Sequence, residues 1–471
     1  MSGCWSASGA QLPIDARGFI AGSAAASGLD RSRPAWFARA PGRLDLLGGI
    51  ADYSGSLCLE WPLAEAACAA VQLADDGLVT ACSHAPGPLR QLSLPVAMVD
   101  DAEALRQATA AEDRIWARYL LGPLAMLAEQ RQVRWPGARI VLDSQVPEGA
   151  GVSSSAAVGV ACLVAAAAAA GLALDGGAIA HLAQRSEHRV AGAPCGIMDQ
   201  CTVAFGRAGE LLRLRCQPDV VEGHLPLPPG IAAWGIDSGQ RHAVSGADYG
   251  AVRTACAMGA VLLAHHAGAR LTSAGSGRLI IEHAPWGEYL VNLPPSRLDS
   301  SLLPEHLRGA DFLTTYGGVA DGLARIDPDR DYAVRAATAH PIHEHHRVRL
   351  AAELLSRPRL GSEAAALLGE LLFQSHASYG ACGLGASGPD ALVSAVRAAI
   401  ANGAPLIGAK ITGGGSGGTV AVLGCDDPAS AQAVSAIAAD YRQRTGVGGR
   451  VFADSSPGAI AVGARQLTWK D

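Results

Sequence analysis

The strongest candidate for chemistry in this sequence is a short glycine- and serine-rich segment at residues 147–155. Its glycines let the backbone pass close to a ligand, three hydroxyls follow, and an alanine-rich run that favours a helix begins at once. Free N–H groups at a helix N-terminus carry about half a unit of positive charge and bind phosphate. The segment therefore predicts a phosphate-binding loop made by Gly149, Gly151, Ser153, Ser154 and Ser155. A serine that only caps a helix after a turn would give the same pattern. The rest of the sequence must therefore distinguish a phosphate-binding loop from an ordinary helix cap.

A second glycine-rich segment, at residues 412–418, allows two other interpretations. Residues 414–418 fit the G-x-S-x-G pattern of hydrolases, and residues 413–418 fit the dinucleotide pattern G-x-G-x-x-G. Both patterns require a strand before the motif and a helix after it, whereas the β-branched residues 419–423 predict a strand after it. We therefore disfavour both. The chain also contains no Gly-Lys pair, so a Walker A loop is absent.

Length and composition limit the classes of function. A chain of 471 residues is long enough for two domains, and its formal charge is 37 − 43 = −6, which argues against a nucleic-acid partner. Its 11 cysteines show no CxxC spacing, and the N-terminus lacks the pattern of a signal peptide, so we expect reduced thiols in the cytoplasm. The uncharged run at residues 156–174 is mostly alanine, and it predicts a buried helix rather than a membrane span.

The elements that must position these loops alternate between strands and helices. We expect strands at 35–40, 57–73 and 138–142, helices at 115–130 and 178–190, and a turn at Pro41-Gly42. A cluster of prolines near residues 220–232 predicts a boundary, after which a strand opens the second half. This gives an N-terminal extension at 1–34, an N-terminal domain at 35–230 and a C-terminal domain at 231–471.

Three segments together resemble a known family. PGRLDLLG at residues 41–48, the loop at 147–156 and KITGGGSGG at 410–418 are similar to motifs 1, 2 and 3 of the superfamily of galactokinase, homoserine kinase, mevalonate kinase and phosphomevalonate kinase. They occur in the family's order across about 380 residues. The resemblance implies an α+β, two-domain sugar kinase fold with the active site in the cleft between the domains. It also implies ATP and Mg²⁺ as cofactors, and a small-molecule sugar as partner rather than nucleic acid or a membrane.

The resemblance also implies roles for single residues. Residues 195–200 resemble the galactokinase branch, in which Asp199 would orient or deprotonate the anomeric hydroxyl with Arg43 beside it. Glu187 and Ser155 would hold the metal, and Trp116 and Tyr119 match positions near the adenine. Thr412, Gly413, Gly414, Gly415 and Ser416 would form the motif 3 loop. From the residues alone, Arg43 could form a surface salt bridge and Glu187 could be a solvated charge. Asp199 could cap a turn, and the aromatic pair could belong to the core.

At the sugar end the sequence departs from galactokinases and resembles the kinase domain of plant L-arabinokinases, at residues 48–56, 234–239 and 246–250. The plant proteins carry an additional N-terminal domain without a counterpart in this sequence. The resemblance implies that the sugar contacts Gly49, Ile50, Asp52, Gly196, Asp199 and Tyr249. Galactokinases have Glu-His in place of Gly49-Ile50, beside the C6 hydroxyl that L-arabinopyranose lacks. An unpartnered polar pair costs about 1–3 kcal/mol, so Gly-Ile suits a pentose.

We therefore expect an ATP-dependent kinase that phosphorylates the anomeric hydroxyl of L-arabinose. Exchanging Gly49 for Glu together with Ile50 for His should then move selectivity toward galactose. A galactokinase and a non-catalytic sugar and ATP sensor of the same fold remain alternatives. The four histidines at 340, 343, 345 and 346 could suggest zinc, but their segment resembles a structural part of the same family.

Overall fold

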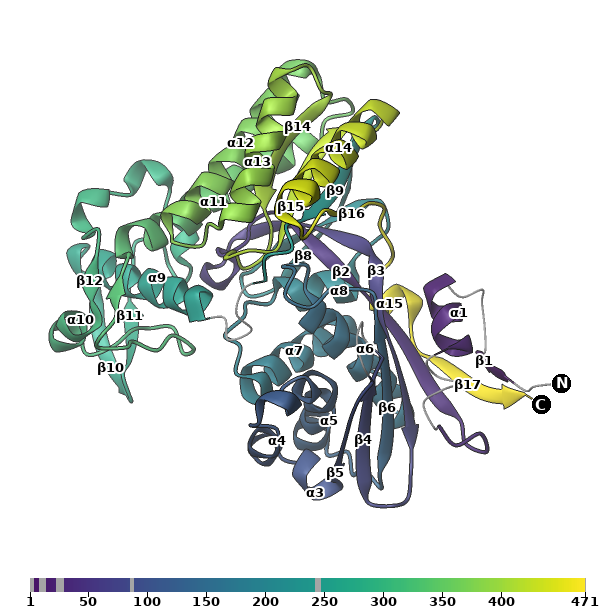
Figure 1. Ribbon diagram of the computed structural model, residues 1–471. Coiled ribbons are helices and arrows are strands. Elements are labelled where there is room, and N and C mark those ends of the chain that lie inside the picture. Colours follow the sequence, from purple (N-terminus) through teal and green to yellow (C-terminus); the bar gives the residue numbers. More distant parts are fainter. Residues whose placement is uncertain (1–3, 8–13, 23–28, 85–88, 242–246, 471) are drawn as a thin grey trace.

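The computed structural model describes residues 4–7, 14–22, 29–84, 89–241 and 247–470, so parts of the predicted N-terminal extension lie outside the described residues. Helices and strands are mixed along the whole chain, and the strands form two larger sheets (Figure 1). The α+β class expected from the sequence is confirmed.

The larger sheet is built mainly from the first half of the chain. Its order is β1 (Cys4–Ala7), β17 (Arg465–Lys470), β2 (Ala35–Leu47), β3 (Leu57–Leu73), β6 (Ala138–Ser144), β4 (Leu78–Ser83) and β5 (Arg90–Pro95). β7 (Glu210–Arg215) pairs with β3, and β8 (Val220–Pro226) pairs with β7. The pairs are antiparallel except β4 with β6. Since β17 pairs with β2, the end of the chain lies in this sheet and not with the rest of residues 231–471.

The turn predicted at Pro41-Gly42 is wrong, because β2 continues through both residues. The register of β2 against β3 shifts between Pro41 and Arg43. Such an irregularity allows a strand to contain proline, which has no N–H group for pairing. A Cβ on Gly42 would lie 2.9 Å from the carbonyl oxygen of Val152. The irregularity therefore brings β2 against the predicted phosphate loop.

The alanine-rich run forms α6 (Ser154–Ala169), which packs on β2 and β3. Its residues from Ala156 to Ala167 are buried, and the small side chains allow helix and sheet to approach closely. It also packs against α5 (Ala117–Arg131), α7 (Gly176–Ser186) and α8 (Met198–Phe205). The short helices α3 (Val96–Val99) and α4 (Ala102–Ala108) pack against α5. In the part of the chain that the structure describes, no helix is both long and apolar enough to cross a membrane.

The second sheet has the order β14 (Leu406–Ile411), β15 (Thr419–Cys425), β9 (Ile231–Asp237) and β16 (Arg450–Phe452). It is accompanied by α12 (Ser362–Ala381), α13 (Ser387–Ala401) and α14 (Pro428–Thr445), in the upper part of Figure 1. β14 and β15 pair antiparallel, so residues 412–418 form a hairpin loop. The rejection of the hydrolase and dinucleotide patterns is confirmed, because a strand and not a helix follows this loop.

Two long helices connect the sheets to a smaller lobe. α9 (Ala247–His266) and α11 (Val334–Leu355) pack against each other, and α11 also packs on α12. The lobe, at the left of Figure 1, contains β10 (Arg270–Gly275), β11 (Arg278–Glu282), β12 (Leu307–Arg308), α10 (Gly309–Tyr316) and β13 (Asp331–Tyr332). The short helices α1 (Ile14–Ala21) and α15 (Ala459–Val462) complete the described elements that the figure labels.

Candidate active site

The three glycine-containing segments meet at one cavity of about 640 Å³, lined by residues from both halves of the chain. Most residues that the sequence marked for the site line it: Arg43, Ile50, Asp52, Trp116, Tyr119, Gly149, Gly151, Ser153, Ser154, Ser155, Glu187, Gly196, Asp199, Tyr249, Gly413, Gly414, Gly415 and Ser416. Gly49 and Thr412 are not among the lining residues. Thr412 is buried and its hydroxyl accepts a hydrogen bond of 2.7 Å from the backbone N–H of Asp45, so it joins motif 3 to motif 1.

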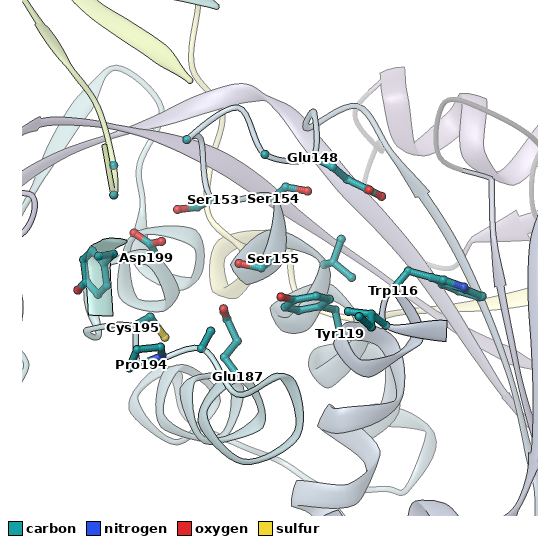
Figure 2. A pocket seen from close by; sticks show the side chains of 18 of the residues that line it. Trp116, Tyr119, Glu148, Ser153, Ser154, Ser155, Glu187, Pro194, Cys195 and Asp199 are labelled. Atoms are coloured by element: carbon teal, nitrogen blue, oxygen red, sulfur yellow. The ribbon is translucent and has the colours of Figure 1, made fainter. Parts of the chain in front are cut away.

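The serines stand at the start of α6, as expected for a phosphate loop. Ser153 adopts a left-handed conformation with φ of 58°, and α6 begins at the next residue. The Ser153 hydroxyl is buried without a hydrogen-bond partner, although a buried polar group normally has one. Figure 2 shows the three serines along the cavity wall. The helix N-terminus and the unpaired hydroxyl together suit an anion with several acceptor oxygens.

The glycines of the two loops permit backbone to lie against backbone. A Cβ on Gly413 would lie 2.6 Å from the Gly151 carbonyl oxygen, and one on Gly418 would lie 2.7 Å from that of Ala150. The Thr419 hydroxyl also donates to the Ala150 carbonyl, at 2.8 Å. The hairpin loop therefore supports the phosphate loop directly.

Arg43, which is buried, and Asp199, which is partly exposed, form an ion pair at the wall of the cavity. Arg43 Nε donates to Asp199 Oδ1 at 2.9 Å, and Nη2 lies 2.7 Å from the same oxygen. Arg43 Nη1 donates to the Gly151 carbonyl at 2.7 Å, which ties the pair to the phosphate loop. Burial alone lowers the pKa of Arg43, but the carboxylates of Asp199 and Glu60 outweigh it, so its pKa is raised and the guanidinium stays charged.

The Asp52 side chain can take its position only because residue 196 is a glycine. A Cβ at position 196 would lie 1.6 Å from Asp52 Oδ2, so the carboxylate occupies the space that only a glycine leaves free. Asp52 is buried, and its Oδ1 has no hydrogen-bond partner. Burial, and then the negative charge of Asp199, raise the pKa of Asp52 to about 6. An unpaired carboxylate oxygen in a cavity wall suits an incoming hydroxyl.

Glu187 lies at the first position of a short π-helical segment, Glu187–Ala191, that continues α7. Its carboxylate accepts a hydrogen bond of 2.7 Å from Gln200 Nε2, and Gln200 and Ser155 both favour its charged form. Burial and the charge of Asp199 raise its pKa to about 7. In Figure 2 it points toward the helix start that carries the serines. Glu187 and Ser155 supply the hard oxygen donors that Mg²⁺ prefers, and they fit an ion whose other ligands are phosphate and water.

Trp116 and Tyr119 form another part of the wall, and Figure 2 shows Trp116 and Asp199 at opposite ends of the labelled residues. The Arg90 guanidinium lies 5.3 Å from the Trp116 ring centroid, and it pairs with Glu148 of the phosphate loop at 2.5 Å. Aromatic rings and an aliphatic wall that includes Leu142 and Val158 suit a flat base. Arg90 could not be recognised from the sequence, since a lone arginine on a strand belongs to no motif.

The structure corrects the role expected for Gly49. A Cβ there would lie 2.0 Å from the Tyr379 hydroxyl and 2.2 Å from Asp45 Oδ2, so the residue faces packed protein and not the cavity. The combined Gly49 and Ile50 exchange is therefore not a clean test of sugar selectivity. Ile50 does line the cavity, is 1% exposed and has φ of 50°, which is strained for a β-branched residue.

Sequence reasoning missed a buried ion pair behind this position. Lys410 Nζ lies 2.5 Å from Asp45 Oδ2, both side chains are fully buried, and the Tyr379 hydroxyl donates to Asp45 at 3.2 Å. Only one other residue of the chain, Lys470, is a lysine, so a lysine inside motif 3 was a usable sign. The pair joins motif 1 to motif 3 beneath the cavity.

Two family models match separate parts of the chain. The model of the GHMP kinases N terminal domain matches residues 118–207, and that of the GHMP kinases C terminal domain matches residues 352–443. The chain is 38% identical to L-arabinokinase of Arabidopsis thaliana, over 90% of this chain and 46% of that protein. It is 30% identical to galactokinase of Chloroflexus aurantiacus, over 88% of this chain and 90% of that protein. The chain thus spans about half the length of the Arabidopsis protein.

Solved structures agree on the fold. Galactokinase of Lactococcus lactis, complexed with galactose, superposes with a TM-score of 0.69 at 19% identity, covering 94% of this chain and 97% of that one. Mevalonate kinase of Methanococcus jannaschii gives a TM-score of 0.53 at 11% identity, covering 92% and 98%. With its motifs, fold and relatives in agreement, the chain belongs to the GHMP kinases. Within that class, it is similar to the sugar kinases L-arabinokinase and galactokinase.

Proposed function

We propose that this protein is an ATP-dependent sugar 1-kinase that converts L-arabinose and ATP into L-arabinose 1-phosphate and ADP. The observation that carries the proposal is the Arg43–Asp199 ion pair, which lines the same cavity as the phosphate loop. Arg43 is also hydrogen-bonded to that loop, through the Gly151 carbonyl. Phosphoryl transfer depends mainly on positioning and charge neutralisation, and a carboxylate beside a guanidinium at a phosphate site supplies both.

In the reaction, the anomeric hydroxyl of the sugar lies against Asp199, which takes its proton. The hydroxyl oxygen attacks the γ-phosphorus of ATP, a new P–O bond forms, and the bond to the β-phosphate oxygen breaks to release ADP. Arg43 remains charged throughout, since neighbouring carboxylates raise its pKa. It can therefore stabilise negative charge on the moving phosphoryl group.

The phosphates of ATP would bind at the start of α6, where the Ser153 hydroxyl has no other partner. The adenine would lie against Trp116 and Tyr119. Glu187 and Ser155 would hold Mg²⁺, which when bound neutralises phosphate charge. Among the described residues no group of three His, Cys, Asp or Glu could hold a metal, and this agrees with an ion bound chiefly by phosphate and water.

Sugar selectivity is proposed to lie at Ile50, Asp52, Gly196 and Tyr249, which line the cavity. Asp52 presents an unpaired carboxylate oxygen for ring hydroxyls, whereas Ile50 presents an apolar surface. A hydroxymethyl group such as C6 of galactose would find no hydrogen-bond partner in the Ile50 side chain, and leaving it unpaired costs about 1–3 kcal/mol. The 38% identity to L-arabinokinase supports the same choice of sugar.

A coupled assay of ADP release with L-arabinose, D-galactose, D-galacturonate and D-fucose tests this function. We expect the highest kcat/KM with L-arabinose. A higher value with D-galactose would replace the proposal by galactokinase, the alternative that the Chloroflexus relative supports. Binding of sugar and ATP without ADP release would favour a sensor.

A further inference from the structure

The four histidines that suggested a metal divide into two kinds in the structure. All lie on α11, but His340 and His345 are 1% and 6% exposed, whereas His343 and His346 are exposed. The buried two do not face a common ligand. Together with Glu344, which is fully buried, they contact residues 48–57, which join β2 to β3 and include the first residue of β3. We call this segment the sugar loop. This loop carries Ile50 and Asp52.

Glu344 holds the beginning of the sugar loop. Its Oε1 accepts the backbone N–H of Gly48 at 3.1 Å and the Ser375 hydroxyl at 2.8 Å. Its Oε2 accepts Arg347 Nε at 2.7 Å. Burial alone raises the pKa of Glu344, but Arg347, His340 and Lys410 outweigh it and lower the pKa to about 2. The carboxylate is thus a permanent charged acceptor for the Gly48 amide.

His340 holds the next residue. Its Nε2 lies 3.1 Å from the Gly49 carbonyl oxygen, and its Nδ1 lies 2.8 Å from the Ser378 hydroxyl. Since a carbonyl can only accept, Nε2 must carry the hydrogen, and neutral His340 then accepts the Ser378 hydrogen at Nδ1. Burial lowers the pKa of His340 to about 4, which keeps this neutral form at physiological pH.

His345 holds the other end of the loop. The backbone N–H of Leu57 donates to its Nδ1 at 3.0 Å, so that nitrogen must be unprotonated. Burial lowers the pKa of His345 to about 4 as well. One helix therefore bonds Gly48 and Gly49 at the entry of the sugar loop and Leu57 at its exit, while none of the three side chains lines the cavity.

We propose that His340, Glu344 and His345 are positioning residues, which fix both ends of the sugar loop and thereby place Ile50 and Asp52 for the sugar. This inference rests on the proposed function for the identity of the ligand. The histidine-rich part of α11 would thus act on the sugar site indirectly, through hydrogen bonds to the backbone of the sugar loop. Loss of one anchor should weaken sugar binding while leaving the ATP site intact, because the phosphate loop is held separately, by Arg43 and Thr419.

The first test measures KM for L-arabinose and for ATP in variants of the full chain. His345→Leu and His340→Leu should raise the sugar KM roughly tenfold, the effect of one lost hydrogen bond, with little change in the ATP KM or in kcat. His345→Asn keeps an acceptor near the Nδ1 position, and His340→Gln keeps a donor near Nε2, so both should recover most of the affinity. His343→Gln and His346→Gln are matched controls on the same helix and should match the parent.

The second test needs no activity, and so it separates this inference from the proposed function. Hydrogen–deuterium exchange without ligands should show faster exchange at residues 48–57 in His345→Leu, and unchanged exchange at residues 147–155. Unchanged exchange in the sugar loop would overturn the inference. Faster exchange across the whole chain, or equal rises of both KM values, would also overturn it, because the helix would then support the fold in general.

Discussion

Replacing Gly196 with alanine should damage the sugar site through a contact that is worked out directly from the structure. The added Cβ would lie 1.6 Å from Asp52 Oδ2, about half of an ordinary carbon–oxygen contact, so the carboxylate must move by more than about 1.5 Å. A hydrogen bond stretched by that amount is lost. Bonds to a charged acceptor contribute about 1.5–3 kcal/mol, which corresponds to a rise in sugar KM of about 10- to 150-fold.

The measurement is steady-state ADP release at pH 8, where Asp52 is ionised, with L-arabinose and ATP varied in turn. The KM for ATP should stay near that of the parent, because Gly196 clashes with Asp52 and not with the phosphate loop. Gly159→Ala is a suitable control, since a Cβ there meets nothing within 4 Å and α6 continues through it.

A double variant makes the reasoning refutable. Asp52→Ala removes the group that the new methyl would displace, so Asp52→Ala with Gly196→Ala should be no worse than Asp52→Ala alone. If the two effects add, or if Gly196→Ala binds the sugar normally, the proposed mutual dependence of Gly196 and Asp52 is wrong.

Three further changes give measurable outcomes. Asp199→Ala should lower kcat by roughly 100-fold or more with the fold intact by circular dichroism, and retained turnover would place the base elsewhere. Because Asp52 has a pKa of about 6, sugar affinity should fall about tenfold between pH 7 and pH 5 as the carboxylate gains its proton, and Asp52→Asn should remove this part of the pH profile. Lys410→Met leaves Asp45 buried without its cation and should lower the free energy of unfolding by about 3–5 kcal/mol, measured by urea denaturation, while adding Asp45→Asn should recover part of the loss.

Gly49 and Ile50 show what a sequence comparison can identify and what requires the structure. The sequence identified both positions as departures from galactokinases, but it could not say which of the two faces the sugar. Only the packed structure places Tyr379 and Asp45 against Gly49, from segments that lie 330 and 4 residues away in the chain. Ile50→His in the presence of Gly49 is consequently the cleaner test of sugar selectivity.

The sequence alone was sufficient to predict those structural features that depend on residues close together in the chain. The glycine and serine run predicted the loop before α6, and the β-branched residues after the second glycine run predicted β15, because backbone freedom and side-chain shape act over a few residues. The expected turn at Pro41-Gly42 failed for the opposite reason, since pairing of β2 with β3 across a bulge outweighed the local preference.

Contacts between distant segments were decided by the tertiary structure alone. The pairing of Arg43 with Asp199, the space that Gly196 leaves for Asp52, and the bonds from α11 to the sugar loop join residues more than 140 positions apart. Burial then sets their charges, raising the pKa of Asp52 and Glu187 and lowering that of His340. Sequence by itself named the residue types that a sugar kinase needs, whereas packing and desolvation determined which of them face the ligand and in what state of charge.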